Sequence, residues 1–138
     1  MIRGDTEKIN LSTSSFERMI TDGYLYIDKT RFIENFLNNA SSVQLVARQR
    51  RLGKSLNMDM LRCFLTDKDD FRHLFKGLYI ETSKVWNYAN SAPVFYFDFK
   101  NLSADSYKED IVNQVDRHFS AICDTDTLSG RSKRLYDT

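Results

Sequence analysis

The sequence predicts an α/β protein in which helices flank a partial parallel sheet. Two short apolar runs, residues 43–47 and 94–99, have the β-rich composition of strands that are covered on both faces. Apolar residues at helical spacing precede, separate and follow these runs. We expect the two runs to be parallel strands of one sheet. The chain between them would then form a crossover connection, which is right-handed by default.

Length and composition indicate one folded domain over residues 1–138. Hydrophobic residues make up 41% of the chain and aromatic residues 13%, which excludes a disordered protein. Lys and Arg number 20 against 19 Asp and Glu, so the net charge gives no general argument for nucleic-acid binding. Cys63 and Cys123 lack metal or redox spacing. Without an apolar leader or membrane-length run, we expect a cytoplasmic location.

The first elements are predicted to be a short helix and a short strand. Residues 1–13 are polar and without a clear period, and we expect them to be loosely ordered. Ser14 and Glu17 have the spacing of a capping box, and Gly23 ends the helix that follows. Residues 24–27 then have strand composition.

The middle of the chain is predicted to be helix, strand, loop and helix. A helix over residues 31–38 carries an apolar stripe, and Asp28 or Thr30 can cap its start. The run 43–47 is the expected central strand. A helix over residues 56–65 follows, and its apolar residues share one face: Leu56, Met60, Leu61 and Phe64.

Further along, short helices precede the second expected strand. The first of them ends at Gly77, and Pro93 ends another because proline cannot continue a helix. Residues 79–81 are expected to be extended. The apolar run 94–99 is the strongest strand candidate, and residues 106–123 form an amphipathic helix. Residues 124–138 are expected to be loosely ordered.

The turn between residues 47 and 56 carries the main functional motif. Gly53-Lys54-Ser55 is the end of a phosphate-binding loop, whose full form is G-x-x-x-x-G-K-[ST]. A glycine lets the backbone approach phosphate oxygens, and the amides that open the next helix favour an anion. Lys54 would reach the β- and γ-phosphates, and the Ser55 hydroxyl would bind Mg²⁺. Arg48 stands where the pattern has its first glycine.

The same turn is rich in arginine, which leaves a second interpretation open. Arg48, Arg50, Arg51 and Lys54 could bind a triphosphate or a nucleic-acid backbone, since both present anionic oxygens. No alternation of aromatic and basic residues accompanies them, which disfavours a single-strand binding surface. A basic loop on an ordinary surface is the remaining interpretation.

Three other residues are candidate metal ligands. Asp98 ends an apolar run, as does the Walker B aspartate that steadies Mg²⁺. Phe99 follows it where a catalytic glutamate usually stands, so we favour a strand-end aspartate without a metal role. His73 and His118 lie on predicted helices without a neighbouring ligand, and we expect surface positions for both.

Residues 48–56, Arg-Gln-Arg-Arg-Leu-Gly-Lys-Ser-Leu, resemble a known family signature. The signature is Arg-Pro-Arg-Arg-Phe-Gly-Lys-Ser-Leu, and it belongs to bacterial AAA-ATPase-like P-loop proteins, which often carry a PD-(D/E)XK nuclease-like domain further along. In that family arginine replaces the first glycine of the loop. Gln49 and Leu52 depart from the signature. The resemblance implies a variant Walker A loop whose nucleotide-binding residues are Arg48, Gln49, Arg50, Arg51, Leu52, Gly53, Lys54, Ser55 and Leu56.

The resemblance extends upstream to the segment that precedes the loop. Tyr24, Tyr26, Asp28 and Lys29 are similar to the family's segment at this place, and in related ATPases such a segment lies near the adenine. We favour a strand whose aromatic residues belong to the core and whose Asp28 caps a helix.

The resemblance covers about residues 10–115 and implies the N-terminal part of a P-loop NTPase-like domain. An Asp-Glu Walker B strand, a sensor and an arginine finger are not recognisable. We therefore expect binding of ATP or ADP with Mg²⁺ and little or no hydrolysis by this chain alone. The alternative is a non-catalytic binding module whose basic loop contacts nucleic acid or a protein partner. An exposed edge at residues 94–99 would favour self-association or pairing with a missing downstream domain.

Overall fold

The structure is a computed structural model that describes residues 2–10, 12–47, 49, 52–97, 99 and 106–122, with only the backbone for 118–122. The chain divides into two compact units, Met1–Val94 and Phe95–Thr138, and each is described by itself. No helix of the described residues has the length and apolar character needed to cross a membrane.

The N-terminal residues form the first strand of a small antiparallel sheet. Strand β1 (Ile2–Arg3) pairs with β2 (Tyr26–Ile27), with Ile2 opposite Ile27. Gly4 permits this close approach, because a Cβ on it would lie 2.1 Å from the Tyr24 carbonyl oxygen. The Arg3 guanidinium also donates hydrogen bonds to two carbonyl oxygens, at 2.8 and 2.9 Å, that belong to Leu74 and Lys76. A segment expected to be loosely ordered therefore holds specific contacts.

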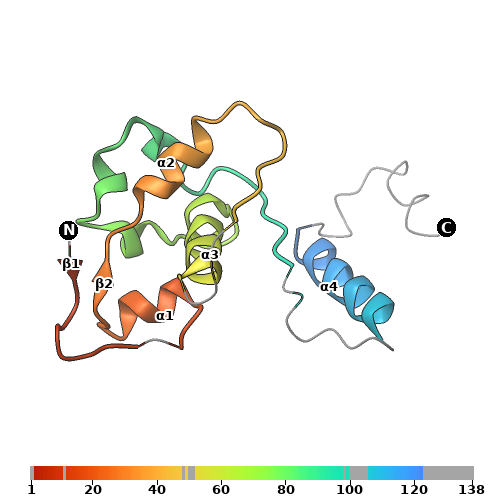
Figure 1. The fold of residues 1–138 in the computed structure, drawn as a ribbon. Coiled ribbons are helices and arrows are strands. Elements are labelled where there is room, and N and C mark those ends of the chain that lie inside the picture. The colour runs from red at the N-terminus through yellow and green to blue at the C-terminus, as the bar shows by residue number, and fades with distance from the viewer. Residues whose placement is uncertain are drawn as a thin grey trace. The chain divides into compact units, whose positions relative to one another are not determined.

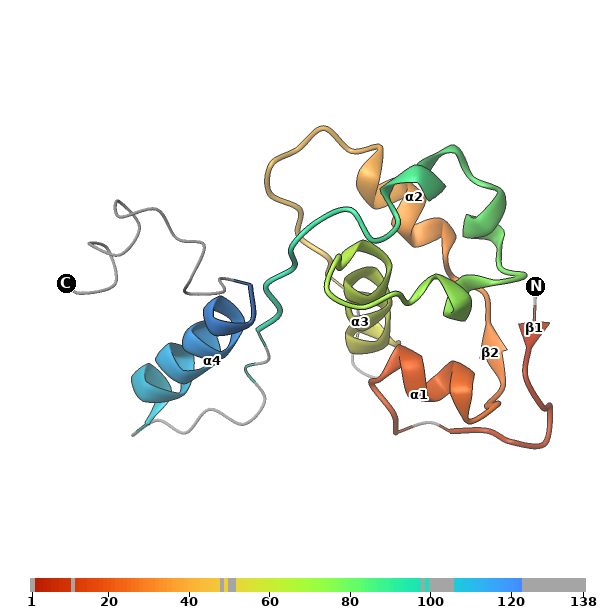
Figure 2. The ribbon, with the colours of Figure 1, turned by 180° about the vertical axis from the view of Figure 1, so that it is seen from behind.

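Helix α1 (Phe16–Thr21) is the first predicted helix, and its cap differs by one residue from the prediction. Ser15 is the N-cap, and its hydroxyl accepts a hydrogen bond from the Arg18 amide at 3.3 Å. The amide of Phe16 donates to the Asp59 carboxylate at 2.8 Å instead of to a local side chain. This bond joins α1 to α3 (Lys54–Leu65), and the two helices lie side by side in both views (Figures 1 and 2).

Helix α2 (Arg31–Leu37) and three 3₁₀ helices complete the first unit. These are η1 (Arg72–Phe75), η2 (Tyr79–Thr82) and η3 (Lys84–Tyr88). The prediction of short helices before Gly77 and Pro93 is confirmed. The extended conformation predicted for residues 79–81 is wrong, because η2 takes its place.

The core of the first unit lies between α1, α3 and the 3₁₀ helices. Phe75 stacks on Phe16, with ring centroids 5.0 Å apart, and meets Phe64 edge-on at 5.4 Å. Aromatic pairs in such geometries stabilise a core beyond their buried area. The buried hydrophobic residues are Phe16, Met19, Tyr26, Ile33, Met60, Leu61, Cys63, Phe64, Leu74, Phe75, Leu78, Ile80 and Val85.

The structure corrects the prediction of a parallel sheet built on residues 43–47 and 94–99. Among the described residues the one sheet is the antiparallel pair of β1 and β2, and parallel pairing is limited to a bridge between Thr66 and Ala92. Residues 43–47 form no strand, and Leu45 is 92% exposed. A strand needs a partner whose place is set by the whole fold, so an apolar run alone does not make one. The described fold is mixed α/β, with helices predominating.

The second unit contains α4 (Tyr107–Ile122), which confirms the predicted amphipathic helix. The Ser106 hydroxyl donates a hydrogen bond to the Asp110 carboxylate at 2.7 Å, and the Asp110 amide donates to the Ser106 carbonyl oxygen at 2.9 Å. The run 94–99 shows no strand at its described positions. Asp98 and residues 124–138 lie outside the described residues.

Candidate functional site

The candidate loop ends at a glycine whose conformation excludes most other residues. Gly53 is the N-cap of α3 and has φ 71° and ψ 24°, in the left-handed region. A side chain at this φ is strained, which explains why a glycine stands directly before the helix. The Asn57 amide then donates to the Gly53 carbonyl oxygen at 2.9 Å, which is the hydrogen bond of the first helical turn. Gly53 thus turns the chain straight into α3.

The start of α3 is chemically suited to an anion. No side chain caps it, and its first turn contains no acidic residue. The first amides of a helix have no acceptor within the helix, and the helix dipole adds positive potential there. Lys54 is exposed at the first helical position and Ser55 is half-buried beside it. The backbone, an ammonium and a hydroxyl therefore lie at one end of one helix.

The structure describes six of the nine residues in the predicted loop. The Leu52 amide donates a hydrogen bond to the Gln49 carbonyl oxygen at 3.4 Å, and both side chains are exposed. Leu56 packs against the buried core. The three that lie outside the described residues are Arg48, Arg50 and Arg51.

Sequence reasoning did not assign a second lysine that the structure places at the loop. A Cβ built on Gly53 would lie 3.8 Å from Lys29 Nζ, and apart from Gly53 and its two chain neighbours no other described residue comes within 4 Å of that position. Lys29 and Gly53 are 24 positions apart, and neither motif spacing nor periodicity relates them. The resemblance of residues 24–29 to a segment before the loop was the one available signal.

Tyr26 has the core role favoured from the sequence, whereas Asp28 does not cap α2, because the N-cap is Thr30 and no side chain forms a cap hydrogen bond there. Tyr26 is 3% exposed and belongs to the core. Asp28 binds at the start of α2, where its carboxylate accepts hydrogen bonds from the Thr30 amide at 2.9 Å and the Thr30 hydroxyl at 2.7 Å. These hydrogen bonds hold the pKa of Asp28 below its ordinary value, although burial opposes them as the largest single effect. Asp28 is therefore a charged carboxylate that organises backbone.

The other ionisable groups of α3 are structural. Burial raises the pKa of the Cys63 thiol to about 12, so a reactive thiolate does not form near neutral pH. Asp59 accepts a hydrogen bond from Arg62 Nε at 2.8 Å as well as from Phe16.

His73 is exposed, and its Nδ1 lies 3.1 Å from the Asp70 carbonyl oxygen. The described residues contain no group of three or more His, Cys, Asp or Glu side chains arranged for a metal.

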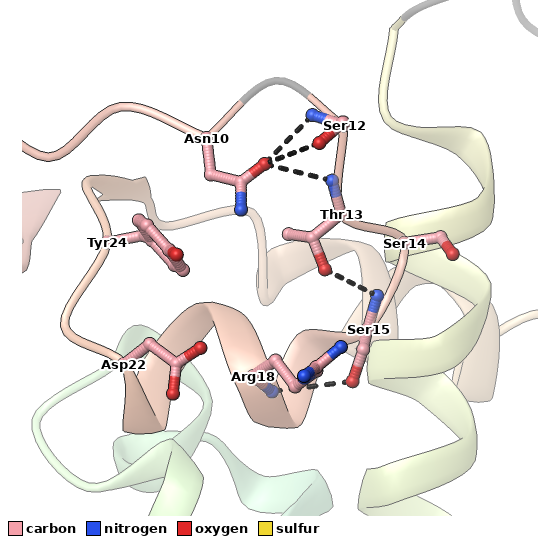
Figure 3. Close-up of a pocket in the computed structure, with 8 residues that line it drawn as sticks. All are labelled: Asn10, Ser12, Thr13, Ser14, Ser15, Arg18, Asp22 and Tyr24. Carbon is pink, nitrogen blue, oxygen red and sulfur yellow. Dashed lines mark hydrogen bonds between the residues drawn. The ribbon is translucent and has the colours of Figure 1, made fainter.

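A polar cavity of about 440 Å³ lies beside α1 (Figure 3). The Asn10 side-chain oxygen accepts hydrogen bonds from Ser12 and Thr13, and the Thr13 hydroxyl accepts one from the Ser15 amide at 3.2 Å. These bonds fold the loop onto the start of α1. The polar groups serve the loop itself, so we assign no ligand to this cavity. Its lining residues are Asn10, Ser12, Thr13, Ser14, Ser15, Arg18, Asp22 and Tyr24.

The features together define a mixed α/β chain with a Gly-Lys-Ser turn that opens directly into an uncapped helix. The family model described as "Predicted AAA-ATPase" matches residues 10–131. The chain belongs to this AAA-ATPase-like family, as the resemblance indicated. The comparisons with curated proteins and with solved structures returned no match.

Proposed function

We propose that this chain binds ATP or ADP with Mg²⁺ through residues 48–56, and that its loop and first long helix are of the P-loop type. One observation carries the proposal. A left-handed Gly53 leads into α3, which begins with Lys54 and Ser55 and has neither a side-chain cap nor an acidic first turn. Membership of a family described as AAA-ATPases supports the same function.

The phosphate chain would lie over the start of α3. The first amides of the helix donate to phosphate oxygens, and Lys54 Nζ adds a charge that reaches the β- and γ-phosphates. The helix amides and the Lys54 ammonium both bind phosphate oxygens and make no contact with the base. These residues therefore do not set the preference for one base over another.

The residues at the start of α3 also fit a magnesium ion. Mg²⁺ at nucleotide sites takes most of its ligands from phosphates and water and needs one or two oxygen ligands from the protein. The half-buried Ser55 hydroxyl would supply such a ligand, and it lies in the same helical turn as Lys54. When bound, Mg²⁺ neutralises part of the phosphate charge. Asp98 lies outside the described residues, and the proposal does not depend on it as a metal ligand.

Binding is proposed without appreciable hydrolysis by this chain alone. Hydrolysis also needs a group that orients the attacking water and a charge that stabilises the transition state. Phe99 stands in the position after Asp98 where a catalytic glutamate is expected. Lys54 and the helix amides supply only the binding half of this chemistry.

Isothermal titration of ATP with Mg²⁺ into the wild type and the Lys54→Ala variant tests the proposal. We expect Lys54→Ala to weaken binding by at least about tenfold, which is the loss of one charge-assisted hydrogen bond. The melting temperature should not change, because the Lys54 side chain is exposed. Lys84→Ala is the matched control, since Lys84 is an exposed lysine on η3.

Two results would contradict the proposal. Equal ATP affinity in wild type and a folded Lys54→Ala variant would remove the P-loop assignment. A wild type that does not bind nucleotide, but binds DNA or RNA with an affinity that falls steeply as the salt concentration rises, would favour the basic loop as a nucleic-acid contact.

A further inference from the structure

Lys29 lies beside the candidate loop with its ammonium exposed and available. Outside Gly53 and its two chain neighbours, its Nζ is the described atom nearest to the open side of Gly53, where a side chain would stand, at 3.8 Å from a Cβ built there. Among the described residues no carboxylate forms an ion pair with it. An exposed ammonium without a carboxylate partner, held beside a left-handed glycine, is arranged for an anion and not for a structural ion pair.

The residues on either side of Lys29 are held by hydrogen bonds to their side chains, one partly buried and one buried. Asp28 accepts one more hydrogen bond through its other oxygen, from the Tyr79 amide at 2.7 Å. The Thr30 hydroxyl, which is fully buried, accepts from the Ile80 amide at 3.2 Å. These bonds tie the segment to η2, a distant part of the chain. The residue between Asp28 and Thr30 therefore has a defined position.

Tyr26 connects the same segment to α3. Its phenolic oxygen accepts a hydrogen bond from the Lys29 amide at 3.3 Å and donates one to the Met60 sulfur at 3.1 Å. Met60 is buried on α3, the helix that Gly53 opens. The buried Tyr26 side chain thus fixes the Lys29 backbone relative to α3. The Lys29 side chain, which carries the ammonium, therefore starts from a defined position.

We propose that Lys29 is a second phosphate-binding cation, which contacts the phosphate chain on the open side of Gly53 while Lys54 contacts it from the helix. This inference rests on the proposed function, and it adds a residue that the loop motif does not contain. The ligand class is a polyphosphate. Two ammonium groups and the helix amides match several negative charges, so the site should favour a nucleoside triphosphate over a monophosphate.

Titration calorimetry with ATP and with AMP, both with Mg²⁺, tests this role. We expect Lys29→Met, which keeps most of the side-chain stem, to weaken ATP binding by about tenfold or more and to reduce the preference for ATP over AMP. Lys29→Arg keeps the charge and should retain most of the affinity. Lys84→Ala removes an exposed lysine elsewhere and should leave ATP binding unchanged. Unchanged melting temperatures establish that each variant is folded.

The outcomes separate this inference from the proposed function. If the wild type binds ATP, Lys54→Ala loses it, and folded Lys29→Met binds as the wild type does, then Lys29 is not a phosphate ligand and the proposed function stands. If the wild type does not bind ATP, the proposed function fails and the role of Lys29 falls with it. Equal weakening of ATP and AMP by Lys29→Met would place the contact at a part that both nucleotides share, and would overturn the role of Lys29 in the preference for a polyphosphate.

Discussion

Replacement of Asp59 by alanine should strongly destabilise the first unit, because one carboxylate serves two elements. Asp59 lies on α3 and is 8% exposed. One of its oxygens accepts the Phe16 amide at 2.8 Å and the other accepts Arg62 Nε at 2.8 Å. Phe16 is fully buried at the start of α1, so its amide cannot turn to water when the carboxylate is removed.

The expected loss follows from these two contacts. A hydrogen bond to a charged acceptor contributes about 1.5–3 kcal/mol, and the unpaired buried amide is part of that loss. The ion pair with the partly exposed Arg62 adds less than about 1 kcal/mol. The free energy of unfolding should therefore fall by about 2–4 kcal/mol, a decrease of roughly 10–25 °C in melting temperature for a unit of this size. Asp59→Asn keeps an oxygen for the Phe16 amide and should cost only about 1 kcal/mol.

Urea unfolding followed by tryptophan fluorescence measures this effect. Trp86 is the one tryptophan in the sequence, and its ring centroid lies 6.0 Å from that of Phe64, so its emission reports on this core. Asp67→Ala is the control, since Asp67 is an exposed aspartate just after α3. An Asp59→Ala variant within about 0.5 kcal/mol of wild type, or an Asp59→Asn variant as damaged as the alanine variant, would refute the reasoning.

Three further predictions concern the chemistry and the stability of the chain. A phosphate-release assay should find turnover far below about one per second; turnover at that rate that vanishes in Asp98→Asn would make Asp98 the metal-site aspartate. The contribution of the Cys63 thiol to stability should be constant below pH 9 and fall as the pH rises from 9 towards 12, because burial raises its pKa from 9.0 to about 12 and the unfolded thiol loses its proton first. Burial also raises the pKa of Tyr26 and acts in the same direction. Urea midpoints at pH 7 and 10.5 measure this, and an equal decrease in Cys63→Ala would exclude the thiol as a cause. In hydrogen exchange, the amides of residues 60–64 should be the slowest and those of 43–47 fast, and slow exchange at 43–47 would mean that those residues form a strand after all.

The features predicted correctly from the sequence are those that depend on near neighbours. Helices α3 and α4 follow from apolar residues three and four positions apart, because one turn of helix brings these residues to one face. The glycine before α3 follows from the same local logic. A left-handed residue at a helix start is a property of one position, and glycine is the residue that takes it without strain.

The sheet could not be predicted in this way, because strand pairing depends on residues far apart. The run 43–47 has strand composition, yet its neighbour in the structure is α2 and not a second strand. The Gln44 side chain donates to the Phe36 carbonyl oxygen at 2.9 Å. Conversely, Ile2–Arg3 forms β1 although residues 1–13 show no period. Its register depends on the close approach of Gly4 to Tyr24, which no local pattern announces.

The α1 cap was mispredicted for the same physical reason. Ser14 and Glu17 have the spacing of a capping box, but Asp59, from α3, binds the Phe16 amide. A carboxylate from another helix is a stronger acceptor than a hydroxyl, and its bond lies inside the core, where water does not compete. The local cap then moves to Ser15, which satisfies the Arg18 amide. A tertiary contact thus decided which serine became the cap.

Residues 26–30 show that a structural role and a functional role need not be alternatives. From the sequence, this segment was either core and helix cap or part of a nucleotide site. The structure assigns Tyr26 to the core, as favoured, while Asp28 accepts the amide of Thr30, the N-cap residue, and does not cap α2 itself. Yet these same contacts fix the backbone of Lys29, whose ammonium lies beside Gly53. Because the backbone of Lys29 is already fixed, a ligand has to order only its side chain. For an exposed lysine this costs about 2 kcal/mol of conformational entropy. The buried residues on either side are therefore the means by which Lys29 can act at the loop.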